Sequence, residues 1–443
     1  MDGCNDVRTF RLPLSVRIGA TMKMNRRDFL KWTGTAGLVV SGGGLWTPAQ
    51  ASATTHEGPY WLTINASGGW DPTLLCDPKG RISATQTDQV NNYYRDDIIP
   101  IGPFKVAPVE GHEAFFERFR NDLLVINGVD TQTNSHETGR RYTWCGSMDP
   151  GFPAFSALVA AASNPRPSLS FLTNGGYSET GGSVPPTRIP DTNAINELAF
   201  PDRLDVSVDD STLHHPSTLE RILAARTDRH NRRLAGSTLP REQRAMSILH
   251  EARTGTNELS QLAEQLPDSL DNSGNRLIRQ AQVAMACFKA GVTVSANLSI
   301  GGFDTHGNHD NSHTPNIQRI LEAVTYAMDE AERLNIADKL YILVGSDFGR
   351  TPWYNDNNGK DHWSITSFLA MGPGIQGGRV IGGTDDYQAP YAVDPSSMSL
   401  SNSGTRIHPA HIHSALRQLA GINQHPIITA WNMEHDALPL WGS

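Results

Sequence analysis

Apolar segments of strand length recur along the chain and alternate with segments of helical periodicity. The clearest helical patterns occupy 273–291 and 315–335, where apolar residues recur every three to four positions. Continuous apolar residues predict strands that are buried on both faces, as in parallel sheets. We expect strands at 60–67, 122–129, 167–173, 292–300, 339–346 and 365–372. The pattern therefore predicts an α/β fold with a mainly parallel sheet covered on both faces.

One stretch departs from this alternation. Residues from about 205 to 270 are rich in Arg, Glu and Gln and have helical spacing without a strand-length apolar run. We interpret the stretch as a helical insertion in a single domain that spans 54–443, a length that one large α/β domain can fill.

The first 53 residues have the features of a twin-arginine export signal. Arg26 and Arg27 are followed by Phe29, Lys31, a short glycine-rich apolar stretch and small residues near position 53. The apolar stretch is short for a membrane span, although an uncleaved anchor stays possible. We expect the twin-arginine translocase as a transient partner, a periplasmic or secreted location, and no stable membrane span after cleavage.

Net charge and cysteine content narrow the function classes. The formal net charge is −9, and the signal carries seven Lys or Arg against three Asp or Glu, so the remainder is near −13. Such an acidic surface argues against nucleic acid as the partner. Cys76, Cys145 and Cys287 remain after processing. Their odd number and wide spacing predict buried cysteines with at most one disulfide.

Polar side chains follow the carboxyl ends of four predicted strands. These residues are Asp71, Asp130, Ser135, His136, Asp304, His306, His309 and Asp347, and the segment "GKDHW" adds Asp361 and His362. Ligands bind beyond the strand carboxyl ends in open parallel sheets, so we expect one shared site. Several carboxylates there would repel one another unless cations neutralise them. Carboxylates with imidazoles are ordinary metal ligands, and zinc, manganese, calcium and magnesium all stay open.

Ordered motifs in this set resemble a known family. "GGFDTHGNH" is followed by "GSDFGRTP", "GKDHW" and "GGRVIGGTD", an order similar to that of the DUF1501 family of exported bacterial proteins. That family is grouped with the alkaline phosphatase and sulfatase superfamily, which implies an alkaline-phosphatase-like α/β/α sandwich. The resemblance covers most of the chain after the signal.

The resemblance also implies roles for particular residues. Asp71 and Asp347 would bind one divalent ion, and Asp304 would bind a second ion with His306 or His309. His362 would complete the second site, with Asp361 beside it.

Three departures from the superfamily pattern argue against classical sulfatase chemistry. Phe348 stands where a histidine is usual, Asp-Thr-His shortens the usual spacing, and no Cys-x-Pro-x-Arg motif occurs.

The function that these residues favour is metal-assisted hydrolysis of a phosphate or sulfate ester, on a small molecule or a glycan. Ser135 is the candidate nucleophile, although its hydroxyl equally fits a helix cap. His136 fits a metal ligand or a partner that orients Ser135. Arg350 is a candidate for gripping an oxyanion. Arg140 and Arg141 fit surface salt bridges at least as well.

The sequence is also compatible with other functions. One is a binding or assembly protein on a degenerate phosphatase-like scaffold; another is a metallohydrolase of a different bond, such as an amide. Neither an HExxH helix nor a GxSxG elbow is present. Tyr142, Trp144 and Trp353 fit a substrate platform or packing. We expect His408, His411 and His413 to serve in capping and packing.

Overall fold

The computed structural model describes residues 55–443, with gaps. The gaps are 84, 86–89, 168, 190–194, 196–198, 201–202, 206–207, 209–210, 240–241, 244–245, 247–249, 251–255, 268, 434, 436 and 443. The predicted export signal therefore lies outside the described residues. No helix in the described part of the chain combines the length and apolarity needed to cross a bilayer.

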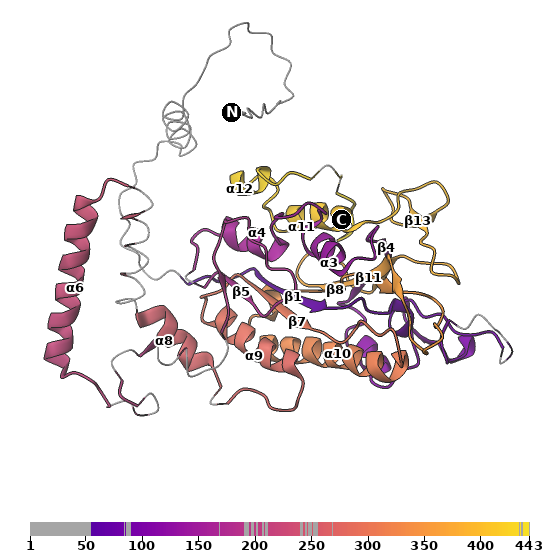
Figure 1. The fold of residues 1–443 in the computed structure, drawn as a ribbon, viewed down its shortest axis with the longest axis horizontal. Coiled ribbons are helices and arrows are strands. Elements are labelled where there is room, and N and C mark those ends of the chain that lie inside the picture. The colour runs from indigo at the N-terminus through magenta and orange to yellow at the C-terminus, as the bar shows by residue number, and fades with distance from the viewer. Residues whose placement is uncertain are drawn as a thin grey trace, which may run out of the picture. The chain divides into compact units, whose positions relative to one another are not determined.

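An eight-stranded sheet forms the centre of the fold (Figure 1). Its order is β12-β4-β11-β8-β1-β7-β5-β6. The strands are β1 (Tyr60–Ala66), β4 (Leu124–Asp130), β5 (Phe171–Thr173), β6 (Pro186–Thr187), β7 (Ser295–Ile300), β8 (Leu340–Ser346), β11 (Ile365–Met371) and β12 (Arg379–Gly382). All six predicted strands are confirmed. The two unpredicted strands of this sheet, β6 and β12, are short and lie at its edges.

Strand direction decides which residues meet at the carboxyl edge. Every neighbouring pair is parallel except the two that involve β11, which is antiparallel to both β4 and β8. The amino end of β11 therefore lies with the carboxyl ends of the other strands. The hairpin of β9 (Gly349–Arg350) and β10 (His362–Trp363) lies just before that end and brings His362 to the same edge.

Helices cover both faces of the sheet, as Figure 1 shows. Side chains alternate along β1: Leu62 and Ile64 join the core beneath α9 and α10, whereas Trp61 joins the core beneath α4 and α11. This double burial accounts for the continuous apolar runs in the sequence. The covering helices are α2 (His112–Arg118), α3 (His136–Cys145), α4 (Phe155–Ala162), α9 (Arg276–Lys289), α10 (His309–Arg333) and α11 (Pro409–Leu419).

The stretch predicted as a helical insertion contains α6 (Pro216–Gly236) and α8 (Thr256–Gln265). None of the residues of α6 is buried, whereas Leu262 of α8 joins the core. Cys76, Cys145 and Cys287 are buried free thiols, so the described residues contain no disulfide. The remaining elements are β2 (Ile99–Ile101), β3 (Phe104–Val106), β13 (Ala392–Val393), β14 (Leu400–Ser401), α12 (Pro426–Thr429), η1 (Pro72–Leu74), η2 (Arg95–Asp97) and η3 (Ala337–Lys339).

Candidate metal centre

The tight approach of three segments builds the site. Gly68, just after β1, has a φ of +119°, and a Cβ there would lie 2.5 Å from the backbone nitrogen of Asp304. Only glycine fits this backbone conformation and this contact. The Gly68 N–H donates to Asp347 Oδ2 at 3.0 Å, which fixes the carboxylate that follows β8. The "SGGWDP" segment therefore brings the ends of β7 and β8 together.

Three histidines converge on the Asp304 carboxylate. Nε2 of His306 and Nε2 of His362 each lie 3.0 Å from Asp304 Oδ1, and these two ring nitrogens are 3.0 Å apart. Nε2 of His136 lies 3.4 Å from Asp304 Oδ2. Ligand atoms of His136, Asp304 and His362 all lie within 4.8 Å of one another, a spacing suited to one metal ion.

The other ring nitrogen of each histidine faces an oxygen that can only accept a hydrogen bond. The pairs are His306 Nδ1 with Asp361 Oδ1 at 2.7 Å, His362 Nδ1 with the Asn134 carbonyl at 2.8 Å, and His136 Nδ1 with Asp347 Oδ2 at 3.1 Å. Each Nδ1 must then carry the proton, so in a neutral ring Nε2 offers a lone pair. Three lone pairs therefore point at a carboxylate, and a proton or a metal ion must lie between them.

The spacing fits a metal ion. Ligands about 2.0–2.1 Å from a tetrahedral zinc lie about 3.3 Å from one another, close to the 3.0 to 3.4 Å separations around Asp304. Histidines that bind metals commonly donate their second N–H to a carboxylate or a carbonyl. The partners of His136, His306 and His362 are of these two kinds.

The Arg350 guanidinium controls the charge of Asp304. Burial tends to raise the pKa of Asp304, but the hydrogen bond and the positive charge of Arg350 outweigh burial and hold the pKa well below its usual value. The carboxylate is therefore ionised at neutral pH. Asp347 raises the pKa of His136 through its hydrogen bond, and Asp304 adds to that rise, while burial opposes it.

One carboxylate oxygen of Asp347 has no hydrogen-bond partner among the described residues. Its side chain is 1% exposed, and Oδ2 accepts from Gly68 and His136. Oδ1 is buried and has no hydrogen-bond partner among the described residues. An unpartnered buried carboxylate oxygen is costly, and a nearby cation would offset that cost.

Asp71 lies in a second, closed cluster. Its Oδ2 accepts from Lys360 Nζ at 2.7 Å and from His309 Nε2 at 3.1 Å. Its Oδ1 accepts from both the backbone and the hydroxyl of Thr73. Lys360 Nζ also donates to Thr73 and to Asn91. All lone pairs of Asp71 are thus used, and an ammonium occupies the position of a cation.

The histidines of this closed cluster form a loop of hydrogen bonds with one consistent direction. The Asp71 N–H donates to His313 Nε2 at 2.8 Å, so His313 carries its proton on Nδ1 and donates to Thr305 Oγ1 at 3.0 Å. The Thr305 hydroxyl then donates to His309 Nδ1 at 2.7 Å, and His309 Nε2 donates to Asp71. Burial lowers the pKa of both histidines, so both are neutral.

The predicted site residues therefore divide into separate groups. Asp71 and His309 lie outside the candidate metal centre, in a cluster where Lys360 and Thr73 donate hydrogen bonds to the Asp71 carboxylate. Asp361 reaches the centre only through His306. Sequence reasoning missed Lys360, Asn91, Thr305 and His313. The letters "GKDHW" contain Lys360, but nothing in the sequence tells that its side chain turns inward.

The two residues predicted for catalysis with His136 lie in different environments. Ser135 precedes α3, is exposed, and its hydroxyl makes no capping hydrogen bond. The Arg350 guanidinium is fully buried and donates to the carbonyls of Gly68, Gly69 and Lys360 and to Asp304. Its hydrogen bonds hold the site together, and the role expected from the sequence, gripping an oxyanion, stays a prediction.

Other expectations concern packing. His413 is buried and bonds the Thr143 carbonyl at 2.7 Å, and His408 bonds the Asp130 carbonyl at 2.9 Å. Both contacts confirm the structural role expected for the histidines of α11. Tyr142 and Trp144 are buried and pack, whereas Trp353 is 45% exposed. Arg141 forms an ion pair with Glu137, as expected, but Arg141 itself is buried and does not lie at the surface.

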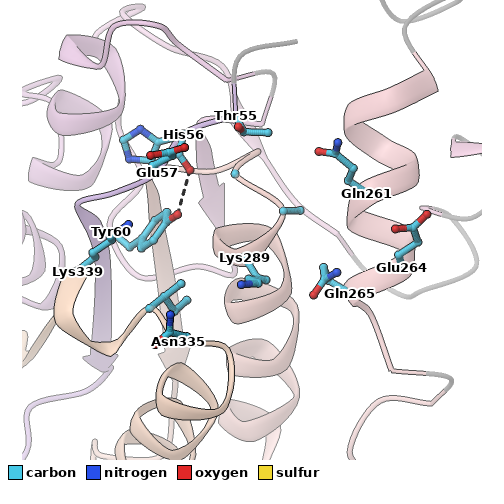
Figure 2. A pocket seen from close by; sticks show the side chains of 13 residues that line it. Thr55, His56, Glu57, Tyr60, Gln261, Glu264, Gln265, Lys289, Asn335 and Lys339 are labelled. Atoms are coloured by element: carbon cyan, nitrogen blue, oxygen red, sulfur yellow. Dashed lines mark hydrogen bonds between the residues drawn. The ribbon is translucent and has the colours of Figure 1, made fainter.

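A cavity of about 460 Å³ lies apart from the candidate metal centre (Figure 2). It adjoins the first residues of β1, where the Tyr60 hydroxyl donates to the His56 carbonyl at 2.9 Å. The amino end of β1 is opposite to the edge that holds Asp304. Lys289 and Glu264 also line this cavity, and among the described residues no cluster of three metal-ligand side chains lies there.

The fold and the cluster define the class: an α/β protein with a histidine–carboxylate centre at the carboxyl edge of a mainly parallel sheet. Residues 112–432 match the family described as "Protein of unknown function (DUF1501)". The chain belongs to the DUF1501 family, as its motifs indicated. Among curated proteins, none matches the chain in sequence.

Solved structures with similar folds are distant. One, from a Bacteroides thetaiotaomicron locus for metabolism of multiple glycosaminoglycans, is 10% identical over 87% of this chain and 77% of its own, with a TM-score of 0.39. TAB5 alkaline phosphatase is 10% identical over 84% and 100%, with a TM-score of 0.36. The PsFucS1 sulfatase of Pseudoalteromonas sp. is 10% identical over 87% and 72%, with a TM-score of 0.39. Likeness at this level says nothing about activity.

Proposed function

We propose that this chain is an exported metal-dependent hydrolase of phosphate or sulfate esters, with one divalent ion at His136, Asp304 and His362. His306 completes the ligand set. The observation that carries the proposal is the convergence of three Nε2 lone pairs on the ionised Asp304 carboxylate. Asp347 Oδ1, which is buried and unpartnered among the described residues, adds to the need for a cation.

A bound ion would polarise the ester and supply a nucleophile near neutral pH. The residues of the chain prepare the site for this chemistry. Asp347 and Asp361 hold His136 and His306 in the tautomer that presents Nε2. Arg350 anchors Asp304 and the glycine turn after β1.

Ser135 is the candidate nucleophile in this proposal. It immediately precedes His136, and its hydroxyl is not engaged as a cap. The amino end of α3 also favours an anionic group, because its first N–H groups point outward and the helix dipole is positive there. A phosphate or sulfate ester suits that position better than a neutral amide.

A non-catalytic metal-binding protein is the second candidate. Lys360 closes the Asp71 cluster, so the described residues offer one candidate ion site where the family resemblance implied two. Metal binding without ester hydrolysis is the outcome that separates this candidate from the first.

The deciding experiment combines metal analysis with an ester panel. The purified chain without its signal is assayed for zinc, manganese, calcium and magnesium, and for hydrolysis of p-nitrophenyl phosphate, p-nitrophenyl sulfate and sugar phosphates and sulfates. We expect one ion per chain and hydrolysis of at least one ester class. The matched control is Asp329→Ala, an exposed carboxylate outside the centre. A chain that binds no ion at micromolar metal would refute the proposal.

A further inference from the structure

A cleft of about 340 Å³ lies among Lys79, Arg95, Pro352 and Asp386. Three large apolar side chains line it and are unusually exposed: Ile82 at 67%, Tyr387 at 65% and Trp353 at 45%. Exposed apolar groups gathered in a cleft mark a binding surface more often than isolated ones do. The volume lies within the range of about 300–1,000 Å³ that small-molecule sites occupy.

Trp363 ties this cleft to the metal centre. Its ring packs edge-on against Trp353, with ring centroids 5.7 Å apart, on one wall of the cleft. Its Nε1 donates to the Gln388 carbonyl at 3.3 Å, next to Tyr387 on the opposite wall. Trp363 also follows His362 directly on β10. A ligand in the cleft would therefore lie beside the strand that presents His362 to Asp304.

The wall that carries Tyr387 is held in one conformation. The Asp385 carboxylate accepts hydrogen bonds from the backbone of Tyr387 and of Ala389. Gln388 has a φ of +58°, which is uncommon outside glycine. Its buried side-chain amide has no hydrogen-bond partner among the described residues. Strained backbone and unpaired buried polar groups of this kind concentrate at functional sites.

The lining combines aromatic faces with an ionic rim. Arg95 and Asp386 pair at 2.8 Å with side chains that are 48% and 64% exposed, and Lys79 pairs with Asp77. A purely apolar ligand would remove water from these ion pairs without offering them hydrogen bonds, and a nucleic acid is opposed by the acidic surface. A sugar presents C–H faces that stack on aromatic rings and hydroxyls that bond to charged side chains.

We propose that this cleft binds a sugar, so that the substrate is a glycan ester whose sulfate or phosphate lies at the metal centre. The assignment of the ester rests on the proposed function, whereas binding of a sugar in the cleft does not. Trp353 and Tyr387 contact the sugar faces, and Arg95 with Asp386 contacts the hydroxyls.

The test measures binding without catalysis. Fluorescently labelled chain is applied to an array of sulfated, phosphorylated and neutral glycans, and the dissociation constant of the best glycan is measured by calorimetry. Trp353→Ala and Tyr387→Ala should each weaken binding about tenfold. Leu400→Ala, which removes an equally exposed side chain outside the cleft, should leave it unchanged.

The outcomes separate the two proposals. Absence of glycan binding, or equal binding by the Trp353→Ala, Tyr387→Ala double variant, overturns the sugar cleft. Glycan binding that needs both aromatic residues, combined with no hydrolysis of any ester, overturns the proposed function and leaves the sugar cleft standing. Hydrolysis of small esters with no glycan binding overturns the sugar cleft and leaves the proposed function standing.

Discussion

Two clusters of histidine and carboxylate side chains lie at the carboxyl edge of the same sheet and differ in how their protons are arranged. Around Asp71, donors and acceptors alternate, and the Lys360 ammonium balances the buried carboxylate. Around Asp304, three ring nitrogens and a carboxylate present lone pairs to one another. The same residue types thus build a closed network in one place and a candidate cation site in the other.

The difference teaches how to read such clusters. Histidine and aspartate in proximity indicate a metal only after each ring has been assigned a tautomer from its second hydrogen bond. Thr305 and the Asp71 N–H set the tautomers of His309 and His313 so that the loop satisfies itself. Asp361, Asp347 and the Asn134 carbonyl set the tautomers of the three histidines around Asp304. With these tautomers the Asp304 cluster cannot satisfy its own hydrogen bonds.

The largest expected effect follows from removing Asp304. Asp304→Ala deletes the carboxylate on which the three Nε2 atoms converge, so bound metal should be lost and turnover should fall by about 100-fold or more. Metal analysis and ester hydrolysis measure the two losses, with Asp329→Ala as the control. Full metal content in Asp304→Ala would contradict the site.

Breaking the closed cluster around Asp71 should lower the stability of the fold and should not lower its metal content. Lys360→Met leaves Asp71 as a buried charge without its ammonium partner, which costs about 3–5 kcal/mol of unfolding free energy. Urea denaturation measures the loss, and Lys105→Met, at an exposed position, is the control. A Lys360→Met chain that keeps its stability would show that the pair is not what balances Asp71.

Lowering the pH should also act on the closed cluster. Burial lowers the folded-state pKa of His309 and His313. Below about pH 6.5 these two histidines are therefore protonated in the unfolded chain but stay neutral in the folded chain. Stability is therefore full above about pH 6.5 and falls as the pH decreases, by at most about 1.4 kcal/mol per histidine per pH unit.

Denaturation at pH 7.0 and 5.5 measures this slope. His313→Gln should be less stable at neutral pH and should reduce the slope. An unchanged slope in this variant would mean that other groups cause the pH dependence.

The smallest effect concerns a residue behind the metal ligands. Asp361→Ala removes the acceptor that orients His306, and loss of such a partner typically weakens metal affinity about 10–100-fold. Competition with a chelator measures the affinity, and Asp356→Ala in the same polar loop is the control. Equal affinity in the two variants would show that His306 needs no orienting partner.

Much of the fold was predictable because burial leaves a direct mark on the sequence. Strands covered on both faces need continuous apolar residues, and all six predicted strands are present. Their carboxyl-end polar residues do gather at one edge. The reversal of β11 was not predictable, because an apolar run has no direction; it emerges from pairing with β4 and β8.

The sequence by itself determined the elements of the sheet, the residue types at its carboxyl edge and the family. Only the tertiary structure decided which of those residues share a centre. Asp71 and Asp304 look alike in sequence, each an aspartate after a strand and a glycine pair. Lys360 and Arg350 reach them across 289 and 46 positions of the chain. The charge balance and tautomers of each cluster depend on such long-range contacts, which local sequence does not encode.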